Sequence, residues 1–140
     1  KKFGTRDGAE KVFVQEFRKN KVELVLLIGF MKILSPYFVR EFRGRIWNIH
    51  PSLLPKHAGG MNMNVHEEVL RAGEKESGCT LHEVSEEVDA GKIISQQKVP
   101  VSENETPETL KEKVQKAEQE CIVRALKKVI NGQLIIGEQK

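Results

Sequence analysis

The chain has 140 residues and a mass of 15.9 kDa, enough for one domain that buries roughly two thirds of its unfolded surface without disulfides or metals. Its 23 basic and 20 acidic residues leave a net charge of +3 that is spread along the sequence, so electrostatics do not favour a nucleic-acid partner. No apolar run approaches the ~20 residues needed to cross a bilayer, which argues against a membrane protein.

The cysteines and the first residues indicate the setting of the chain. Cys79 and Cys121 are far apart and show no C-x-x-C spacing, which predicts two reduced thiols in a cytoplasmic protein and no metal site. The sequence starts with Lys1-Lys2-Phe3-Gly4, which is neither a signal peptide nor an initiator methionine. We therefore expect it to begin within a longer protein.

The first half of the chain predicts a helix, a strand, a second helix and a second strand. Apolar residues at helical spacing predict an amphipathic helix over 7–20, and the apolar run 23–28 predicts a strand covered on both faces. Ser35 and Pro36 suit the N-cap and first turn of a helix over 36–42. A strand over 45–49 then completes a unit whose crossover should be right-handed.

The second half begins with a loop over 55–63 that contains Gly59-Gly60, followed by an amphipathic helix from 64 or 65 to 72. Segments 79–84 and 92–101 are β-rich. The acidic stretch 86–91 between them is long enough to fold over a ligand. Thr106-Pro107 starts the longest helix, which should end at Asn131-Gly132. Without repeats or linkers, these elements predict one α/β domain over 1–140.

The most informative stretch is Asn48-Ile49-His50-Pro51-Ser52-Leu53-Leu54-Pro55. Asn48 and His50 are two residues apart on a predicted strand, so their side chains leave the same face of the sheet. Pro51 stops the strand and leaves the imidazole at its tip, where open α/β sheets bind ligands.

Asp89, in the acidic loop, is the third polar residue of interest. Singly, Asn48, His50 and Asp89 are more often a cap, a hydrogen-bonded histidine and a turn former. Together they supply an oxyanion donor, a group that titrates near neutral pH and a carboxylate, which suits acyl transfer without a covalent intermediate. Ser52 lacks a G-x-S-x-G elbow and neither cysteine has an activating neighbour, so a covalent nucleophile is not expected.

The other histidines give weaker signals. His57 and His66 are interpreted as solvated or packing residues, and they form no H-E-x-x-H zinc motif. His82 shares a strand face with Thr80 and Val84. A structural role is its default interpretation, and support of the site residues is the alternative.

Three motifs in order carry a family resemblance: Gly29-Phe30-Met31-Lys32-Ile33-Leu34-Ser35-Pro36, then Asn48 to Pro55, then Val88-Asp89-Ala90-Gly91. Together they resemble the glycinamide ribonucleotide formyltransferases of de novo purine synthesis. The likeness covers about 6–132 and corresponds to the carboxyl-terminal two thirds of that family. It implies a partial Rossmann-like formyltransferase fold, with a mixed, mostly parallel sheet flanked by helices and without the family's first βαβ part.

The resemblance implies transfer of a formyl group from the co-substrate 10-formyltetrahydrofolate to the amine of glycinamide ribonucleotide. Asn48 would hydrogen-bond the formyl oxygen, His50 would stabilise the oxyanion, and Asp89 would orient His50 and relay the proton of the attacking amine. The family's folate-binding positions fall on Met31, Lys32, Ile33, Leu34, Val39, Glu86, Glu87 and Val88. Its ribonucleotide-binding positions fall on Gln115 and Glu118. From periodicity alone, Met31, Ile33 and Leu34 would be ordinary core residues, and Gln115 and Glu118 a solvated helix face.

The sequence departs from the family in one respect. The glycine-rich loop that holds the substrate phosphate has no counterpart in these 140 residues. We expect the activity to depend on that segment. The alternatives are an inactive folate-binding fragment, a 10-formyltetrahydrofolate hydrolase, or a formyltransferase for initiator tRNA or amino sugars. Pro51 and the lack of an extra basic domain favour the glycinamide enzyme. The expected partners are small molecules, with no nucleic acid and no membrane, and the chain is expected to be a monomer or weak homodimer.

Overall fold

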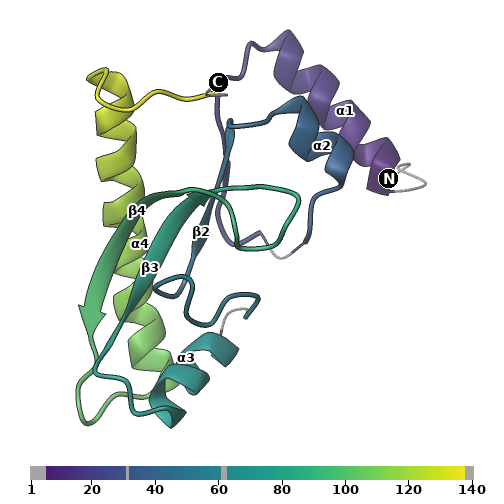
Figure 1. Cartoon of the computed structure of the whole chain (residues 1–140). Helices are drawn as coiled ribbons and strands as arrows, with labels where there is room; N and C mark the ends of the chain where they lie inside the picture. Colours follow the sequence, from purple (N-terminus) through teal and green to yellow (C-terminus); the bar gives the residue numbers. More distant parts are fainter. Residues whose placement is uncertain (1–5, 31, 61–62, 138–140) are drawn as a thin grey trace.

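The computed structural model describes residues 6–30, 32–60 and 63–137, which form one layered α/β unit (Figure 1). Helices and strands follow in the order α1 (Arg6–Lys19), β1 (Val25–Leu27), α2 (Pro36–Glu41), β2 (Ile46–His50), α3 (Met63–Arg71), β3 (Glu76–Glu83), β4 (Ile93–Pro100) and α4 (Pro107–Ile130). The order and type of the elements predicted from the sequence are confirmed.

The four strands form one sheet in the order β1-β2-β3-β4. β1 and β2 are parallel, whereas β2 with β3 and β3 with β4 are antiparallel. The mixed sheet is therefore confirmed, but the expectation of a mostly parallel one is wrong for the described strands. The segment between β3 and β4 contains no helix that would carry the chain back to the other end of the sheet, so it reverses the chain instead.

β1 is shorter and less covered than the sequence predicted. Only Val25 to Leu27 pair with β2, and all three are partly exposed, because among the described residues β1 has a neighbouring strand on one side only. Ile28, the next residue, is 61% exposed. The predicted cover on both faces is nevertheless present in part, because Leu24 and Leu26 pack against the larger core and Val25 and Leu27 against the cluster formed with α1 and α2, and it ends before Ile28.

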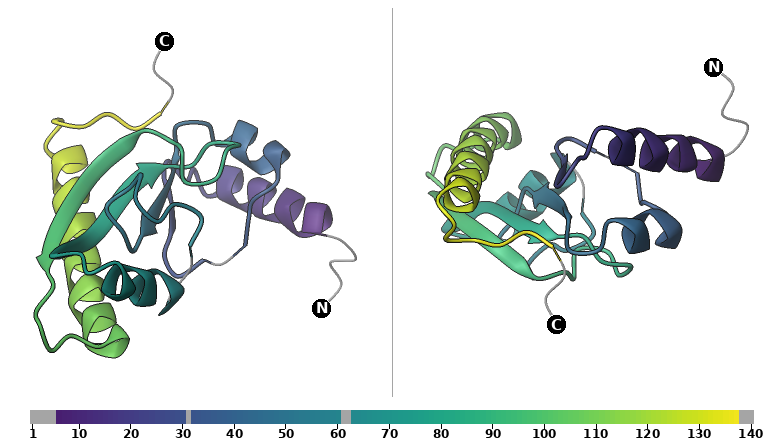
Figure 2. Two further views of the ribbon diagram at one scale, coloured as in Figure 1. Left: turned by 60° about the horizontal axis from the view of Figure 1, so that its bottom comes forward. Right: turned by 90° about the horizontal axis from the view of Figure 1, so that it is seen from above.

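Alternating residues of β2 divide between two apolar layers. Trp47 and Ile49 pack in the larger core with α4, which lies along β3 and β4. Ile46 faces the other way, against Phe38 and Phe42 of α2. Figure 2 shows α4 along one side of the sheet, with α1 and α2 together on the other side.

A buried carboxylate joins α1 to the start of α2. Ser35 caps α2 by accepting the Phe38 N–H at 3.3 Å, and its own N–H donates to Glu10 Oε1 at 3.0 Å. The Ser35 hydroxyl also bonds Glu10, which is 5% exposed. These bonds fix the point at which the segment 29–35, which leads from β1, enters α2.

Two further findings concern the whole of the described chain. Within it, no helix combines the length and apolar character needed to span a membrane. Cys79 and Cys121 are both buried and both free, as the predicted reduced thiols require.

The core on α4 gives a matched test of the fold. Val114 is fully buried and Val123, on the same helix, is 50% exposed. Val114→Ala should lower the free energy of unfolding by about 2 kcal/mol, since two buried carbon groups are lost and a cavity remains. Val123→Ala should change it by less than about 0.5 kcal/mol. Urea unfolding of both variants measures the difference, and equal losses would contradict the described packing.

Candidate active site

A cavity of about 260 Å³ lies at the carboxyl end of β2. Its walls come from the segment after β1, the end of β2, the turn at Gly59 and Gly60, the loop between β3 and β4, and the α4 residues Lys111, Gln115 and Glu118. Segments distant in sequence therefore meet around one space, at the strand tip where the sequence placed a ligand site.

β2 presents Asn48 and His50 to this cavity from one face of the strand. The antiparallel register places His82 of β3 opposite Asn48 and Thr80 opposite His50. The Asn48 amide nitrogen lies 3.4 Å from His82 Nε2. The pairing of two strands thus adds a third polar side chain to the predicted pair.

Asp89 reaches the same place from the loop between β3 and β4. Its backbone adopts a φ of 54°, a left-handed conformation that Asp tolerates better than most residues. Asp89 Oδ2 accepts the Gly59 N–H at 2.7 Å and lies 3.5 Å from His50 Nδ1. The structure therefore brings Asn48, His50 and Asp89 together, as the sequence predicted.

The two ring nitrogens of His50 have different neighbours. Nε2 lies 3.1 Å from the His57 carbonyl, which can only accept, so Nε2 carries the hydrogen and donates it. Burial lowers the pKa of His50 and outweighs the opposing effect of Asp89, so its pKa is below the ordinary 6.5. A neutral ring with its hydrogen on Nε2 leaves Nδ1 as a free base beside the Asp89 carboxylate.

His82 is the functional residue that the sequence identified least clearly. It is 2% exposed, its Nδ1 donates to the Glu83 carbonyl at 3.0 Å, and its Nε2 lies 3.6 Å from Asp89 Oδ1. His82 therefore contacts both Asn48 and Asp89. Its shared face with Thr80 was the one signal from the sequence, and the strand register places its ring beside Asn48.

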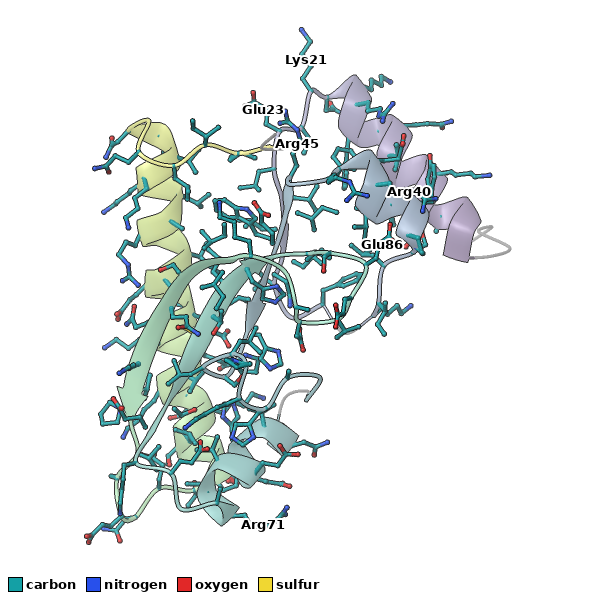
Figure 3. All side chains as sticks on the ribbon, in the orientation of Figure 1. Lys21, Glu23, Arg40, Arg45, Arg71 and Glu86 are labelled. Atoms are coloured by element: carbon teal, nitrogen blue, oxygen red, sulfur yellow. The ribbon has the colours of Figure 1, made fainter. Side chains whose placement is uncertain are left out.

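Most of the positions implied for folate also line the cavity. These are Lys32, Ile33, Leu34, Val39, Glu86, Glu87 and Val88, while Met31 lies outside the described residues. Of these, Ile33 and Val88 are 62% and 50% exposed, so the interpretation of Ile33 as a core residue is wrong. Glu86 is also within 4.0 Å of both Arg40 and Arg43 near α2, and Arg40 and Glu86 are labelled in Figure 3.

At the α4 wall, Gln115 and Glu118 both line the cavity; Gln115 is exposed, as a solvated helix face would be, whereas Glu118 is partly buried. Burial raises the pKa of Glu118 to about 7. Lys111, for which the sequence gave no signal, and His66, which was interpreted as a solvated or packing residue, line the same region. His66 is 2% exposed, its Nδ1 has no hydrogen-bond partner, and burial together with Lys111 lowers its pKa.

His57 is neither solvated nor a packing residue. Its Nδ1 lies 3.1 Å from Glu68 and its Nε2 3.2 Å from Glu74, while its backbone carbonyl holds His50. Sequence spacing gave no signal for this arrangement, because Glu68 and Glu74 belong to α3 and to the turn after it. Within the part of the chain that the structure describes, no group of three His, Cys, Asp or Glu is arranged to hold a metal ion.

Comparison with known proteins places this site in a family. The family model described as "Formyl transferase" matches residues 1–126. The trifunctional purine biosynthetic protein adenosine-3 of Gallus gallus is 46% identical over 138 residues, which cover 99% of this chain and 14% of that protein.

Two solved structures are similar in fold as well. The phosphoribosylglycinamide formyltransferase of Coxiella burnetii superposes with a TM-score of 0.86 at 37% identity, over 97% of this chain and 63% of that one. A formyltetrahydrofolate deformylase from Pseudomonas syringae gives a TM-score of 0.82 at 28% identity, over 93% of this chain and 43% of that one.

The chain thus spans a small part of its trifunctional relatives and less than two thirds of the Coxiella enzyme. Because the family model covers most of its length, the chain belongs to the formyl transferase family.

Proposed function

We propose that the domain formed by residues 1–140 transfers the formyl group of 10-formyltetrahydrofolate to the amine of glycinamide ribonucleotide. The observation that carries the proposal is the 3.5 Å approach of the buried His50 Nδ1 to Asp89 Oδ2, beside the Asn48 amide. The name of the Coxiella relative, a phosphoribosylglycinamide formyltransferase, favours the ribonucleotide as acceptor, and the name of the Gallus gallus relative favours purine biosynthesis.

In the proposed reaction the amine nitrogen attacks the formyl carbon, and the carbonyl electron pair moves to the oxygen. The Asn48 amide donates to that oxygen, which stabilises the negative charge of the tetrahedral intermediate. The amine proton leaves, and the C–N bond to the folate nitrogen then breaks while that nitrogen gains a proton. The products are the formylated ribonucleotide and tetrahydrofolate.

His50 and Asp89 act together as the acceptor of the amine proton. Since Nε2 already holds a hydrogen, the proton enters the ring at Nδ1 and creates an imidazolium. The neighbouring Asp89 carboxylate stabilises this cation, and the imidazolium in turn stabilises the oxyanion. The lowered pKa of His50 keeps the base free before the substrates bind.

The folate ring is proposed to lie between two segments of the cavity wall. Leu34 and Val39 supply apolar surface from one side, and residues 86–88 cover it from the other. Described residues of 29–34 belong to neither helix nor strand, so their peptide groups are available to a flat heterocycle. The exposed Ile33 and Val88 would lose solvent contact when the ring binds.

Gln115 and Glu118 are proposed to hold the ribose region of the ribonucleotide. They lie three residues apart on one face of α4, at the edge of the same cavity. With a pKa raised to about 7, Glu118 is able both to donate and to accept a hydrogen bond at neutral pH. The cytoplasmic location and the monomeric or weakly dimeric state remain predictions from the sequence.

Two alternatives are separated by one assay. The likeness to the Pseudomonas syringae deformylase favours hydrolysis of the formyl folate as the second candidate. Folate binding without catalysis is the third. The chain is mixed with glycinamide ribonucleotide and 10-formyltetrahydrofolate, and the folate absorbance and released formate are followed.

Loss of the formyl folate that requires the ribonucleotide supports the transferase. Formate release without the ribonucleotide supports the hydrolase. Binding of a folate analogue without turnover supports the third candidate, a fragment that binds folate but does not catalyse a reaction. Where turnover is seen, Asp89→Asn should abolish it. Glu103→Gln, which also replaces a carboxylate by an amide but at an exposed site, should not.

The role of His50 gives a quantitative prediction. His50→Ala should lower kcat by about 10²–10³-fold, comparable to the loss of one group that stabilises the oxyanion. Steady-state kinetics measure this loss, and retained binding of a folate analogue shows that the cavity is intact. An unchanged kcat would remove His50 from the mechanism.

Glu118 predicts a pH dependence of stability. Its pKa is raised from an ordinary 4.5 to about 7, so between these pH values the folded state holds a proton that the unfolded state has lost. The free energy of unfolding contributed by this group therefore falls as pH rises from 4.5 to 7. Glu118→Gln should flatten that fall in urea unfolding, and the exposed Glu112→Gln should leave it unchanged. A Glu118→Gln protein with the same pH profile as the parent would contradict the assignment.

A further inference from the structure

The turn at residues 57–60 contacts both members of the proposed acid–base pair. The His57 carbonyl accepts from His50 Nε2 at 3.1 Å, and the Gly59 N–H donates to Asp89 Oδ2 at 2.7 Å. The Gly60 N–H closes the turn by donating to the His57 carbonyl at 3.3 Å. A displacement of this turn therefore changes the positions of His50 and Asp89 together.

The side chain of His57 is itself held between two carboxylates. Nδ1 lies 3.1 Å from Glu68 Oε2 on α3, and Nε2 lies 3.2 Å from Glu74 Oε2 in the turn before β3. Carboxylate oxygens only accept, so the imidazole is the donor in its contacts with Glu68 and Glu74. Only 16% of the His57 side chain is exposed, which limits the competition from water.

The backbone of the turn needs such a restraint. His57 has a φ of 56°, a left-handed conformation that is uncommon outside glycine. A solvated surface histidine would have no side-chain contacts to hold the backbone in that conformation. Glu68 belongs to α3, which packs on α4, and the Glu74 N–H donates to the Val69 carbonyl of α3 at 3.2 Å, so both carboxylates anchor the turn 57–60 to the framework of the domain.

We propose that His57 is a positioning residue, whose imidazole, clamped by Glu68 and Glu74, holds the turn 57–60 in the conformation that orients His50 and Asp89. The catalytic consequence rests on the proposed function, but the clamp itself does not. The charged groups that face His57 are Glu68 from α3, Glu74 from the turn after it and Lys56, bound to Glu74 at 3.8 Å, and the nearby titratable group is His50.

The first test measures the clamp without turnover. The Glu68→Gln/Glu74→Gln variant of the full chain keeps the backbone of His57 and removes both acceptor charges, and Glu67→Gln removes one exposed charge from the same helix. Hydrogen exchange of the Gly59 amide, followed by NMR, reports on the bond to Asp89. It should accelerate by roughly ten-fold in the double variant, the effect of losing one hydrogen bond to a charged group, and stay unchanged in Glu67→Gln.

A double-mutant cycle separates the clamp from a general loss of stability. His57→Asn tolerates the left-handed backbone but cannot reach both carboxylates, so it should accelerate Gly59 exchange to the same extent. Adding it to Glu68→Gln/Glu74→Gln should cause no further acceleration, because the same contacts are already lost. Additive effects, or unchanged Gly59 exchange in the double carboxylate variant, would overturn the proposal.

A kinetic readout then tests the consequence for catalysis. In a protein that turns over, the carboxylate variant should lower kcat by roughly ten-fold with an unchanged KM for the folate, because the clamp touches no part of the folate wall. A raised KM with an unchanged kcat would overturn the positioning role. If the Gly59 amide exchanges faster in the carboxylate variant but the parent chain shows no turnover, the clamp is supported and only the proposed function is contradicted.

Discussion

The hydrogen bond from the Gly59 N–H to Asp89 Oδ2 is the contact on which the site depends, because it joins two loops that come from different parts of the chain. Asp89 belongs to the segment between β3 and β4, and Gly59 to the segment between β2 and α3. An ionised carboxylate that accepts a short backbone bond is held more firmly than a neutral acceptor. With that bond made, Asp89 Oδ2 also lies near His50 Nδ1, and Asp89 Oδ1 lies near His82 Nε2.

The antiparallel pairing of β2 and β3 explains why a loop must return over the sheet. Trp47 at the start of β2 pairs with Glu83 at the end of β3, so the chain leaves β3 at the far end from His50. The loop folds back tightly because Gly91 lies against the Glu83 backbone, where a Cβ would fall 1.7 Å from the Glu83 carbonyl oxygen. The Glu83 N–H closes the loop on the Lys92 carbonyl at 2.8 Å. A side chain at position 91 would push Asp89 away from the cavity.

Local sequence patterns predicted the elements well because each one has a local cause. The N-caps Ser35 and Thr106, the apolar stripe of α4 and the stop at Pro51 act within a few residues, and the structure keeps all of them. The antiparallel direction of β3 was mispredicted, because the direction of a strand depends on how the chain returns to the sheet and not on its local sequence. The roles of His57 and His82 were missed or left open for the same reason, since their partners are set by register and by packing of α3.

Burial shifts the pKa values of the histidines in the site more than the neighbouring charged groups do. His50 lies beside a carboxylate, which alone would raise its pKa, yet its pKa is lowered because its exposure is only 4%. His66, equally enclosed, has no carboxylate to oppose the effect and faces Lys111 instead. Two neutral imidazoles and a Glu118 that is half protonated near pH 7 therefore surround the cavity. In the proposed reaction, such a site would take up the proton of the attacking amine at an uncharged His50, and the Asp89 carboxylate would stabilise the cation once it has formed.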